Sequence, residues 1–228
     1  MTVEIALRRA RVRYGPLEAL HGLDLPVPAA TVTVLLGRNG AGRTTVLRAL
    51  AGTVPLAAGR VVWGGRDVTG LPAHVRARRG LCFVPDLRAV YGTLTVAENL
   101  DLAAPGRRDE ALAAYPELGP LLAHRAATLS GGERRMLALV RAVLAAAPPG
   151  APARVVLVDE PSLGLARAVA SRTYGLLAAL TGPPAHAAVV LAEQRVPPGL
   201  PAGSVAYGLS RGSLVSGDET GHGTRHTG

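Results

Sequence analysis

Gly37-Arg38-Asn39-Gly40-Ala41-Gly42-Arg43-Thr44-Thr45 is the stretch of sequence on which the fold depends. The β-branched run 31–36 precedes it and predicts a buried strand. Residues 45–51 follow, and their apolar members share one face of a helix that Gly52 can end. Glycines let successive backbone N–H groups turn inward around phosphates, at the positive end of that helix. All nine residues of the stretch are therefore predicted to bind a phosphorylated ligand.

One position of this loop departs from the motif G-x-x-x-x-G-K-[ST], because Arg43 stands where the motif has Lys. All 25 basic residues of the chain are Arg, so the change follows a trend of the whole composition. Lys is a compact charge on a slim stem, whereas Arg carries a wider planar head that prefers a bidentate partner. The charge is kept, but we expect its placement against the phosphates to differ.

A second stretch ends an apolar run in two carboxylates. Residues 155–158 are Val-Val-Leu-Val, and Asp159 and Glu160 follow them directly. Asp159 is predicted to hold Mg²⁺ through water, and the hydroxyl of Thr44 is predicted to be a second ligand of the same ion. Glu160 is predicted to be the general base for a water molecule that attacks a phosphate.

The third stretch, Leu129-Ser130-Gly131-Gly132-Glu133, precedes a predicted helix. With the other two in this order, the chain resembles the ATP-binding subunits of ABC transporters over almost its whole length. The resemblance implies that ATP and Mg²⁺ are the cofactors. It also implies that Ser130, Gly131, Gly132 and Glu133 contact nucleotide bound by a partner subunit, so that two chains enclose two ATP molecules head to tail.

Further positions match the same family. Tyr14 looks like the aromatic residue that stacks on adenine, and a tyrosine packed at a strand end for structural reasons is the alternative. Ser162-Leu163-Gly164-Leu165 looks like the loop that crosses the interface between two such subunits.

Within the family, three segments look most like the ATPases of branched-chain amino-acid uptake systems: Phe83-Val84-Pro85-Asp86, Leu94-Thr95-Val96-Ala97-Glu98-Asn99-Leu100 and Leu191-Ala192-Glu193-Gln194. Many ABC ATPases have Gln where this chain has Asp86 and His where it has Gln194. Asp86 is expected to ligate Mg²⁺ while adding negative charge near the phosphates, and Gln194 to donate an uncharged hydrogen bond. Both are predicted catalytic positions beside Glu160.

The remaining pattern predicts one α/β domain with an inserted helical lobe. Strands are expected at 3–14, 60–63, 81–84, 154–158 and 187–192, and helices at 96–102, 108–124, 133–147 and 166–180. Pro26-Val27-Pro28 is interpreted as a break after the first strand. The resemblance implies an ABC-type nucleotide-binding domain over residues 1–215, with a mostly parallel core sheet, an N-terminal antiparallel β lobe and a helical lobe at about 86–147. The polar tail 216–228 is predicted to be disordered.

The composition limits the classes of partner. A chain of 228 residues that is 48% hydrophobic can bury a sizeable core, and no apolar stretch reaches the length of a membrane span. The N-terminus lacks the pattern of a signal peptide, and a single cysteine agrees with a reducing cytoplasm. The net charge of +9 comes from scattered arginines, which indicates a composition bias and not a nucleic-acid-binding surface.

The resemblance implies a transport function at the cytoplasmic face of the cell membrane. The expected partners are membrane permease subunits, a second ATP-binding subunit of the same or a related kind and, indirectly, an extracytoplasmic solute-binding protein. ATP binding and hydrolysis would drive uptake of branched-chain amino acids or a related small solute. The alternative is a nucleotide-binding pseudo-ATPase, weakened by Arg43, that supports a more active partner. An ABC-type ATPase of DNA repair would need a long insertion for which the chain has no room.

Overall fold

The computed structural model describes residues 2–85, 90–146 and 154–215. Its elements are β1 (Val3–Tyr14), β2 (Leu17–Pro28), β3 (Val32–Leu36), α1 (Arg43–Ala51), β4 (Ala58–Trp63), β5 (Arg66–Asp67), α2 (Ala73–Arg78), β6 (Leu81–Val84), α3 (Val96–Ala103), α4 (Arg108–Ala114), the 3₁₀ helices η1 (Pro116–Leu121) and η2 (Ala126–Thr128), α5 (Gly131–Ala146), β7 (Val155–Asp159), α6 (Arg167–Ala179), β8 (Ala188–Glu193), β9 (Val205–Ser210) and β10 (Ser213–Val215). The predicted tail 216–228 lies outside the described residues.

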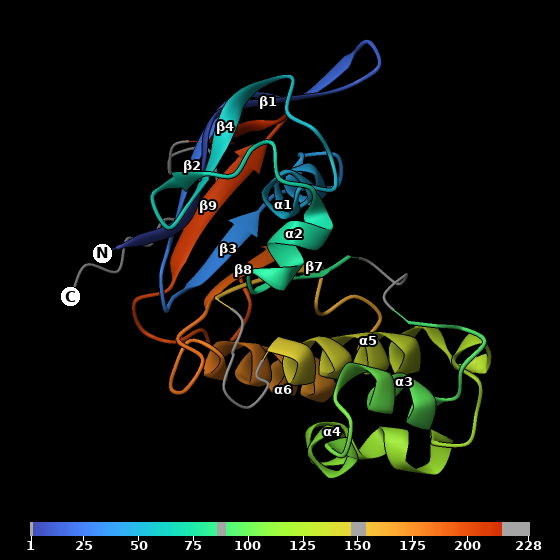
Figure 1. Cartoon of the computed structure of the whole chain (residues 1–228). Coiled ribbons are helices and arrows are strands. Elements are labelled where there is room, and N and C mark those ends of the chain that lie inside the picture. The colour runs from blue at the N-terminus through green and yellow to red at the C-terminus, as the bar shows by residue number, and fades with distance from the viewer. Residues whose placement is uncertain (1, 86–89, 147–153, 216–228) are drawn as a thin grey trace.

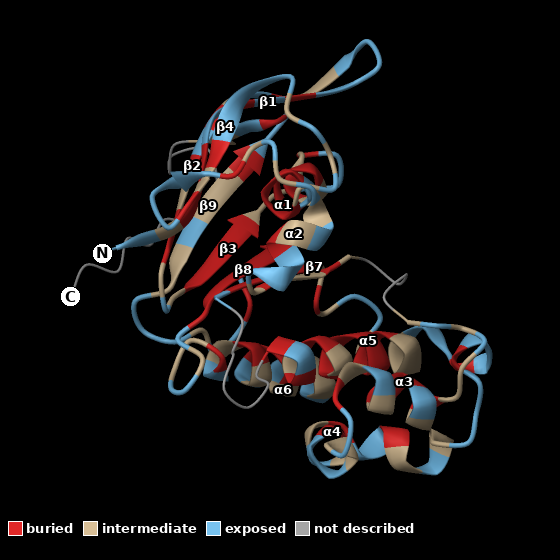
Figure 2. Ribbon diagram, in the orientation of Figure 1, coloured by how far each residue is buried: buried red, intermediate tan, exposed pale blue. Residues whose placement is uncertain are grey.

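A mostly parallel sheet forms the centre of the molecule, as predicted. Its strand order is β10-β9-β3-β8-β7-β6, and every neighbouring pair is parallel except β9 and β10. The strands β7 and β8 are buried along their whole length, because α1 covers one face of the sheet and α5 and α6 cover the other. Figure 2 shows this burial on β3, β7 and β8 and on the side of α5 that faces the sheet. Continuous apolar runs are typical of parallel strands covered on both faces.

A second, antiparallel sheet of order β2-β1-β4-β5 forms the upper lobe in Figure 1, which confirms the predicted N-terminal β lobe. The interpretation of Pro26-Val27-Pro28 as a break was wrong. These residues end β2, where Ala6 pairs with Pro26 and Val3 with Pro28. Proline is tolerated there because β2 is an edge strand, so a residue without an N–H group can face outward.

The helical lobe lies below the core sheet in Figure 1 and contains α3, α4, the 3₁₀ helices and the outer part of α5. The single helix predicted at 108–124 was wrong, because α4 ends at Ala114 and a separate 3₁₀ helix begins at Pro116. Pro116 disfavours helical backbone at Tyr115 and cannot donate an amide hydrogen bond. Within the described residues, no helix is both long and apolar enough to cross a membrane.

A buried arginine ties α2 to the far end of α1. Arg76 is only 2% exposed, and its guanidinium donates to five carbonyl oxygens at 2.7 to 3.1 Å. Two of them belong to Ala49 and Leu50, in the last turn of α1, where carbonyl groups lack the amide of the next helical turn, and the Ala49 carbonyl also accepts the Gly52 amide at 3.2 Å. The other three lie in the segment 68–71. Arg76 therefore anchors the helix that begins at the glycine loop.

We predict that Arg76→Met lowers the free energy of unfolding by about 3 kcal/mol or more, because several buried carbonyl groups lose their donor together. Urea unfolding followed by circular dichroism measures the loss. The matched control is Arg78→Met on the exposed face of the same helix, with an expected change within about 0.5 kcal/mol. Equal stability of the two variants would contradict the anchoring role.

Candidate functional site

The glycine loop between β3 and α1 contains two points where only glycine fits. A Cβ atom on Gly37 would lie 2.5 Å from the carbonyl oxygen of Leu209, and Gly42 has a φ of +104° immediately before the helix. The loop is also held from outside, because the amide of Gly212 in the turn between β9 and β10 donates to the Ala41 carbonyl at 2.9 Å. These constraints fix the loop at the N-terminus of α1, where the first amide groups of a helix have no partner within it and can bind an anion.

A cavity of about 560 Å³ lies over this loop and brings most of the predicted site residues together. Its lining includes Tyr14, Asn39, Gly40, Ala41, Gly42, Arg43, Thr44, Thr45 and Glu160. Gly37, Arg38 and Gln194 line an adjoining cavity of about 930 Å³, which also includes part of the loop. The side chain of Tyr14 is 41% exposed at the end of β1, so its ring is open to a planar ligand. The turn at Arg211 and Gly212, which sequence reasoning missed, also lines the first cavity.

Arg43 is buried, and its head group contacts the predicted general base. Its Nη2 atom donates to Glu160 Oε1 at 2.7 Å and to Asn39 Oδ1 at 3.3 Å, while its side chain is 6% exposed. Among the described residues, Nη1 is a buried donor without a hydrogen-bond partner. The residue that replaces Lys in the loop therefore forms an ion pair with Glu160 and retains a second donor for an anion.

Glu160 has an unusual backbone conformation at the end of β7. Its φ is +46°, a left-handed value that costs a non-glycine residue about 1 to 3 kcal/mol and persists only where neighbouring contacts impose it. Gln194, just after β8, has its Nε2 atom 3.5 Å from Glu160 Oε1. The structure thus places two of the three predicted catalytic residues beside each other. The third, Asp86, lies outside the described residues.

Asp159 fits the predicted magnesium site. The side chain is 3% exposed, and its Oδ1 atom is a buried acceptor without a hydrogen-bond partner among the described residues. Burial raises the pKa of Asp159, and this effect outweighs the opposing hydrogen bond from Thr44 and the charges of Arg43 and Arg135. A buried carboxylate oxygen without a donor, next to a threonine hydroxyl, is a donor set that suits a hydrated Mg²⁺ ion.

Arg135 is a buried charge at the site that sequence reasoning missed. It lies on α5 with no exposed surface and donates to the carbonyl oxygens of Asp159 and Pro85, the latter at 3.4 Å. Its only signal in the sequence is a charged residue within the apolar stripe of a predicted helix. Arg135 links the helix that follows Ser130 to the end of β7.

The segment Ser130–Glu133 stands at the start of α5, whereas the glycine loop precedes α1. Among the described residues the segment Ser130–Glu133 lines neither of the two cavities. Glu133 has a structural role at the start of α5, because its carboxylate accepts the Ser130 amide at 2.7 Å while the Ser130 hydroxyl accepts the Glu133 amide at 3.3 Å. The hydrogen bond that the Glu133 carboxylate accepts from the Ser130 amide lowers the pKa of Glu133. A Cβ on Gly132 would lie 2.9 Å from the Gly164 carbonyl, so this glycine allows α5 to approach the loop after β7.

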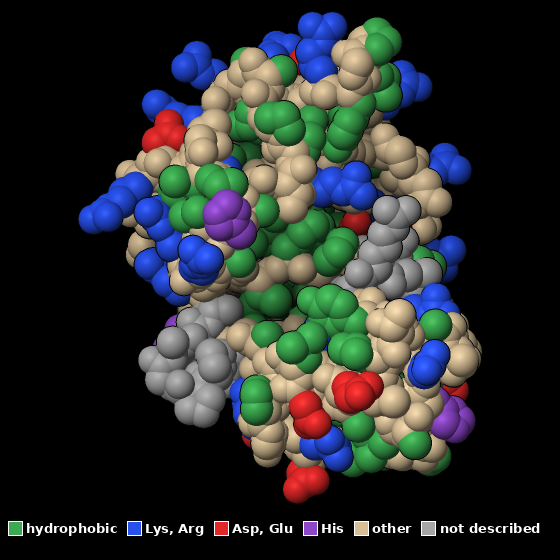
Figure 3. Space-filling view, turned by 45° about the vertical axis from the view of Figure 1, so that its right-hand side comes forward, with side chains coloured by type: hydrophobic (Ala, Val, Ile, Leu, Met, Phe, Trp, Pro, Cys, Tyr) green, Lys and Arg blue, Asp and Glu red, His purple; other side chains and the backbone are tan. Residues whose placement is uncertain are grey.

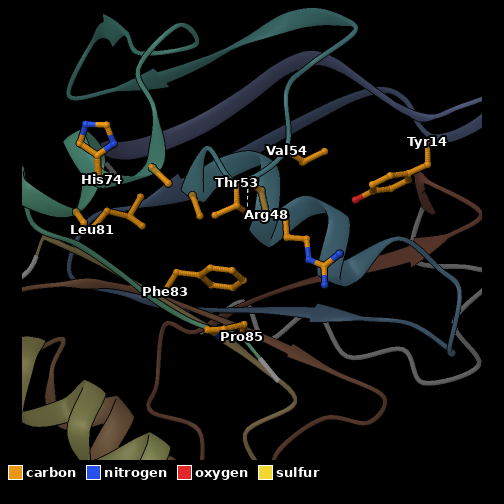
Figure 4. A pocket seen from close by; sticks show the side chains of 11 residues that line it. Tyr14, Arg48, Thr53, Val54, His74, Leu81, Phe83 and Pro85 are labelled. Atoms are coloured by element: carbon orange, nitrogen blue, oxygen red, sulfur yellow. Dashed lines mark hydrogen bonds between the residues drawn. The ribbon is translucent and has the colours of Figure 1, made fainter. Parts of the chain in front are cut away.

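An apolar hollow lies beside the C-terminal half of α1. It has a volume of about 600 Å³, and Figure 4 shows Phe83 and Pro85 opposite Thr53 and Val54, with Tyr14 at one end. In the face shown in Figure 3, hydrophobic side chains gather in the hollowed middle of the molecule, above the helical lobe. Apart from Tyr14, no residue predicted for the nucleotide site lines this hollow, so it is a separate feature of the described surface.

Comparison with known sequences gives consistent results. The model of the ABC transporter family matches residues 20–163. The chain is 33% identical over 213 residues to the high-affinity branched-chain amino acid transport ATP-binding protein BraG of Pseudomonas aeruginosa, covering 90% of this chain and 88% of that protein. It is 33% identical to a probable branched-chain amino acid transport ATP-binding protein, LivF, of Archaeoglobus fulgidus, covering 89% and 86%. It is 35% identical to the lipopolysaccharide export ATP-binding protein LptB of Escherichia coli, covering 67% and 65%.

Solved structures show the same fold. A nucleotide-free ATP-binding cassette of an ABC transporter superposes with a TM-score of 0.74 at 19% identity, covering 94% of this chain and 90% of that one. A bacterial ABC transporter cassette solved as a dimer superposes with a TM-score of 0.76 at 22% identity, covering 92% and 96%. The α/β cassette fold predicted from the sequence is therefore confirmed.

We predict that Asp159→Asn raises the free energy of unfolding of the ligand-free chain by about 1 kcal/mol, or roughly 2 to 4 °C in Tm, because a buried unpaired charge is removed. Since the folded-state pKa is raised, wild type is stabilised at low pH by this group and loses that stability as the pH rises through the folded-state pKa. The difference should therefore grow as the pH rises above about 4, the ordinary pKa of an aspartate, as followed by thermal unfolding. The exposed Asp109→Asn is the control, and an equal shift for both variants would contradict the prediction.

Proposed function

This chain belongs to the ABC transporter family of ATP-binding subunits, and on that premise we propose that it couples ATP binding and hydrolysis to the uptake of branched-chain amino acids or a related small solute. One observation carries the proposal: Arg43, Thr44, Asp159 and Glu160 converge at the N-terminus of α1, over the glycine loop. The names of the relatives BraG and LivF support the choice of solute.

Each residue of the site has a role in this proposal. The backbone amides of the segment 37–45 bind the phosphates, and Tyr14 stacks on adenine. Thr44 and Asp159 would hold Mg²⁺, with Asp86 as a further ligand, and the ion, when bound, neutralises phosphate charge. Glu160 accepts a proton from the attacking water, and Gln194 donates a hydrogen bond to the γ-phosphate.

The protein acts with partners at the cytoplasmic face of the membrane. A second ATP-binding subunit supplies its own Ser130, Gly131 and Gly132 to the nucleotide, which agrees with the finding that, within the described residues, this segment does not line the cavity over the glycine loop of its own chain. The apolar hollow beside Phe83 and Pro85 provides a docking surface for a permease subunit. An extracytoplasmic binding protein would deliver the solute to that permease.

The ion pair between Arg43 and Glu160 sets the expected activity. A carboxylate that accepts a charge-assisted hydrogen bond is less available as a base, so the pair must open before Glu160 can accept a proton. Phosphate oxygens compete for the same guanidinium, and nucleotide binding thus favours the opening. This observation also favours the second candidate function, a subunit that binds nucleotide but hydrolyses it slowly beside a more active partner.

Glu160→Gln tests hydrolysis directly. We expect wild type to hydrolyse ATP about 100-fold or more faster than this variant, because the general base is lost, while both bind ATP with similar affinity. Phosphate release is measured with the purified chain and with its co-purified permease, and uptake of labelled leucine is measured after reconstitution in vesicles. Turnover of wild type no faster than that of Glu160→Gln would identify the pseudo-ATPase, and the absence of ATP binding would overturn the proposed function.

Arg43→Lys tests how far the arginine lowers ATP turnover and ATP affinity. We expect kcat to rise about tenfold and the Kd for ATP to fall several-fold, because a slimmer ammonium group reaches the phosphates and leaves Glu160 free. The control is Arg60→Lys, an exposed arginine of β4 that lines none of the three cavities, which should leave both constants unchanged. Unchanged turnover of Arg43→Lys would show that the arginine already performs the function of Lys.

A further inference from the structure

Glu193 is a buried carboxylate at the end of β8 that has no role in the mechanism above. Its side chain is 6% exposed, and its Oε1 atom accepts two hydrogen bonds, from the Ser162 amide at 3.1 Å and from the Tyr174 hydroxyl at 2.6 Å. Burial and the neighbouring carboxylate raise the pKa of Tyr174, so its hydroxyl keeps its proton and donates it in this bond. The carboxylate thus joins β8 to the loop after β7 and to α6.

The backbone of the same residue holds a different element. The Glu193 carbonyl accepts the Gly37 amide at 3.2 Å, and Leu36 pairs with Glu193 in the parallel register of β3 and β8. The glycine loop is therefore held by a main-chain atom, which no substitution of Glu193 removes. Only the side chain of Glu193 contacts the loop after β7, at Ser162.

The left-handed backbone of Glu160 lies between two bonds to β8. On one side, the Glu160 amide donates to the Ala192 carbonyl at 2.9 Å. On the other side, Pro161 has no N–H group to donate, so the Ser162 amide is the first donor after Glu160, and it binds the Glu193 carboxylate. The strained conformation of Glu160 is thus maintained by two main-chain bonds, the second from the Leu163 amide to the Glu160 carbonyl at 3.0 Å, and by the side-chain bond between Ser162 and Glu193.

We infer that Glu193 is a positioning residue for hydrolysis, whose carboxylate orients Glu160 through Ser162 and is itself oriented by Tyr174. The inference rests on the proposed function, in which Glu160 is the general base. Because Gln194 follows Glu193 directly, the same anchor also sets the place of Gln194 beside Glu160. Loss of the carboxylate should impair the chemical step and leave nucleotide binding intact, since Gly37 keeps its main-chain bond.

The test compares Tyr174→Phe, Glu193→Gln and Glu193→Ala in the full chain with its permease. Tyr174→Phe removes the donor to Glu193, and with it the hydrogen bond to the Ser162 side chain, without changing the shape of the ring, and Glu193→Gln keeps an acceptor oxygen without the charge. We expect kcat to fall about tenfold in Glu193→Ala, which corresponds to the loss of one hydrogen bond to a charged group. In the two milder variants, where such a bond is only weakened, kcat should fall about threefold. The Kd for ATP with Mg²⁺ should stay within about twofold of wild type in all three.

Tyr115→Phe is the matched control. Tyr115 is also a buried tyrosine, and its hydroxyl lies 2.7 Å from the hydroxyl of Thr173, the residue before Tyr174 on α6, instead of bonding to Glu193. The control should lose stability to a similar extent as Tyr174→Phe and keep the wild-type kcat. A purely structural role of Tyr174 would make the two variants indistinguishable in kcat, and that result would overturn the inference.

Hydrogen exchange of the segment 160–166 gives a second readout that does not need hydrolysis. ATP with Mg²⁺ should increase protection of this segment in wild type and in Tyr115→Phe, and not in Glu193→Ala. If wild type binds ATP but does not hydrolyse it, the hydrogen-exchange measurement alone tests the positioning role of Glu193. Equal kcat and equal protection in wild type and all Glu193 variants would overturn the inference alone, whereas a wild-type chain that binds no ATP would overturn the proposed function and the inference with it.

Discussion

The carboxyl ends of three neighbouring parallel strands meet at one edge of the core sheet, and the candidate site depends on this constraint. β3, β8 and β7 lie side by side in the order of the sheet, with Leu36 opposite Glu193 and Asp159 opposite Ala192. The residues that follow each strand therefore lie within a few ångströms of each other although they come from distant parts of the chain. Ligands of open α/β sheets bind at this kind of edge.

The charges at this edge offset one another only in part without a ligand. Asp159, Glu160 and Glu193 contribute carboxylates, and Arg43 and Arg135 contribute guanidinium groups from α1 and α5. Some polar atoms are left over, namely Asp159 Oδ1 and Arg43 Nη1 within the described part of the chain. A negative phosphate and a positive ion would satisfy these two atoms, so the site is arranged for a ligand that carries both kinds of charge.

Local patterns in the sequence predicted the main elements of the fold but not all of them. The apolar runs of β3, β7 and β8 and the glycine loop were recognised because each is a continuous local signal. The end of β2 was misread because Pro26 and Pro28 are typical of breaks, while an edge strand accepts them. The helix predicted at 108–124 was wrong because the apolar pattern continues through Pro116, where the backbone cannot.

The sequence by itself determined which residues stand at the strand ends and that a glycine loop opens a helix, because neighbours along the chain set strand, turn and helix geometry. Only the tertiary structure decided that Arg43 meets Glu160, 117 residues away, and that Glu193 accepts bonds from Ser162 and Tyr174. These contacts depend on the register of parallel strands and on how α1 and α6 pack against them. Side-chain pairing across the sheet is a property of that packing, and no local pattern encodes it.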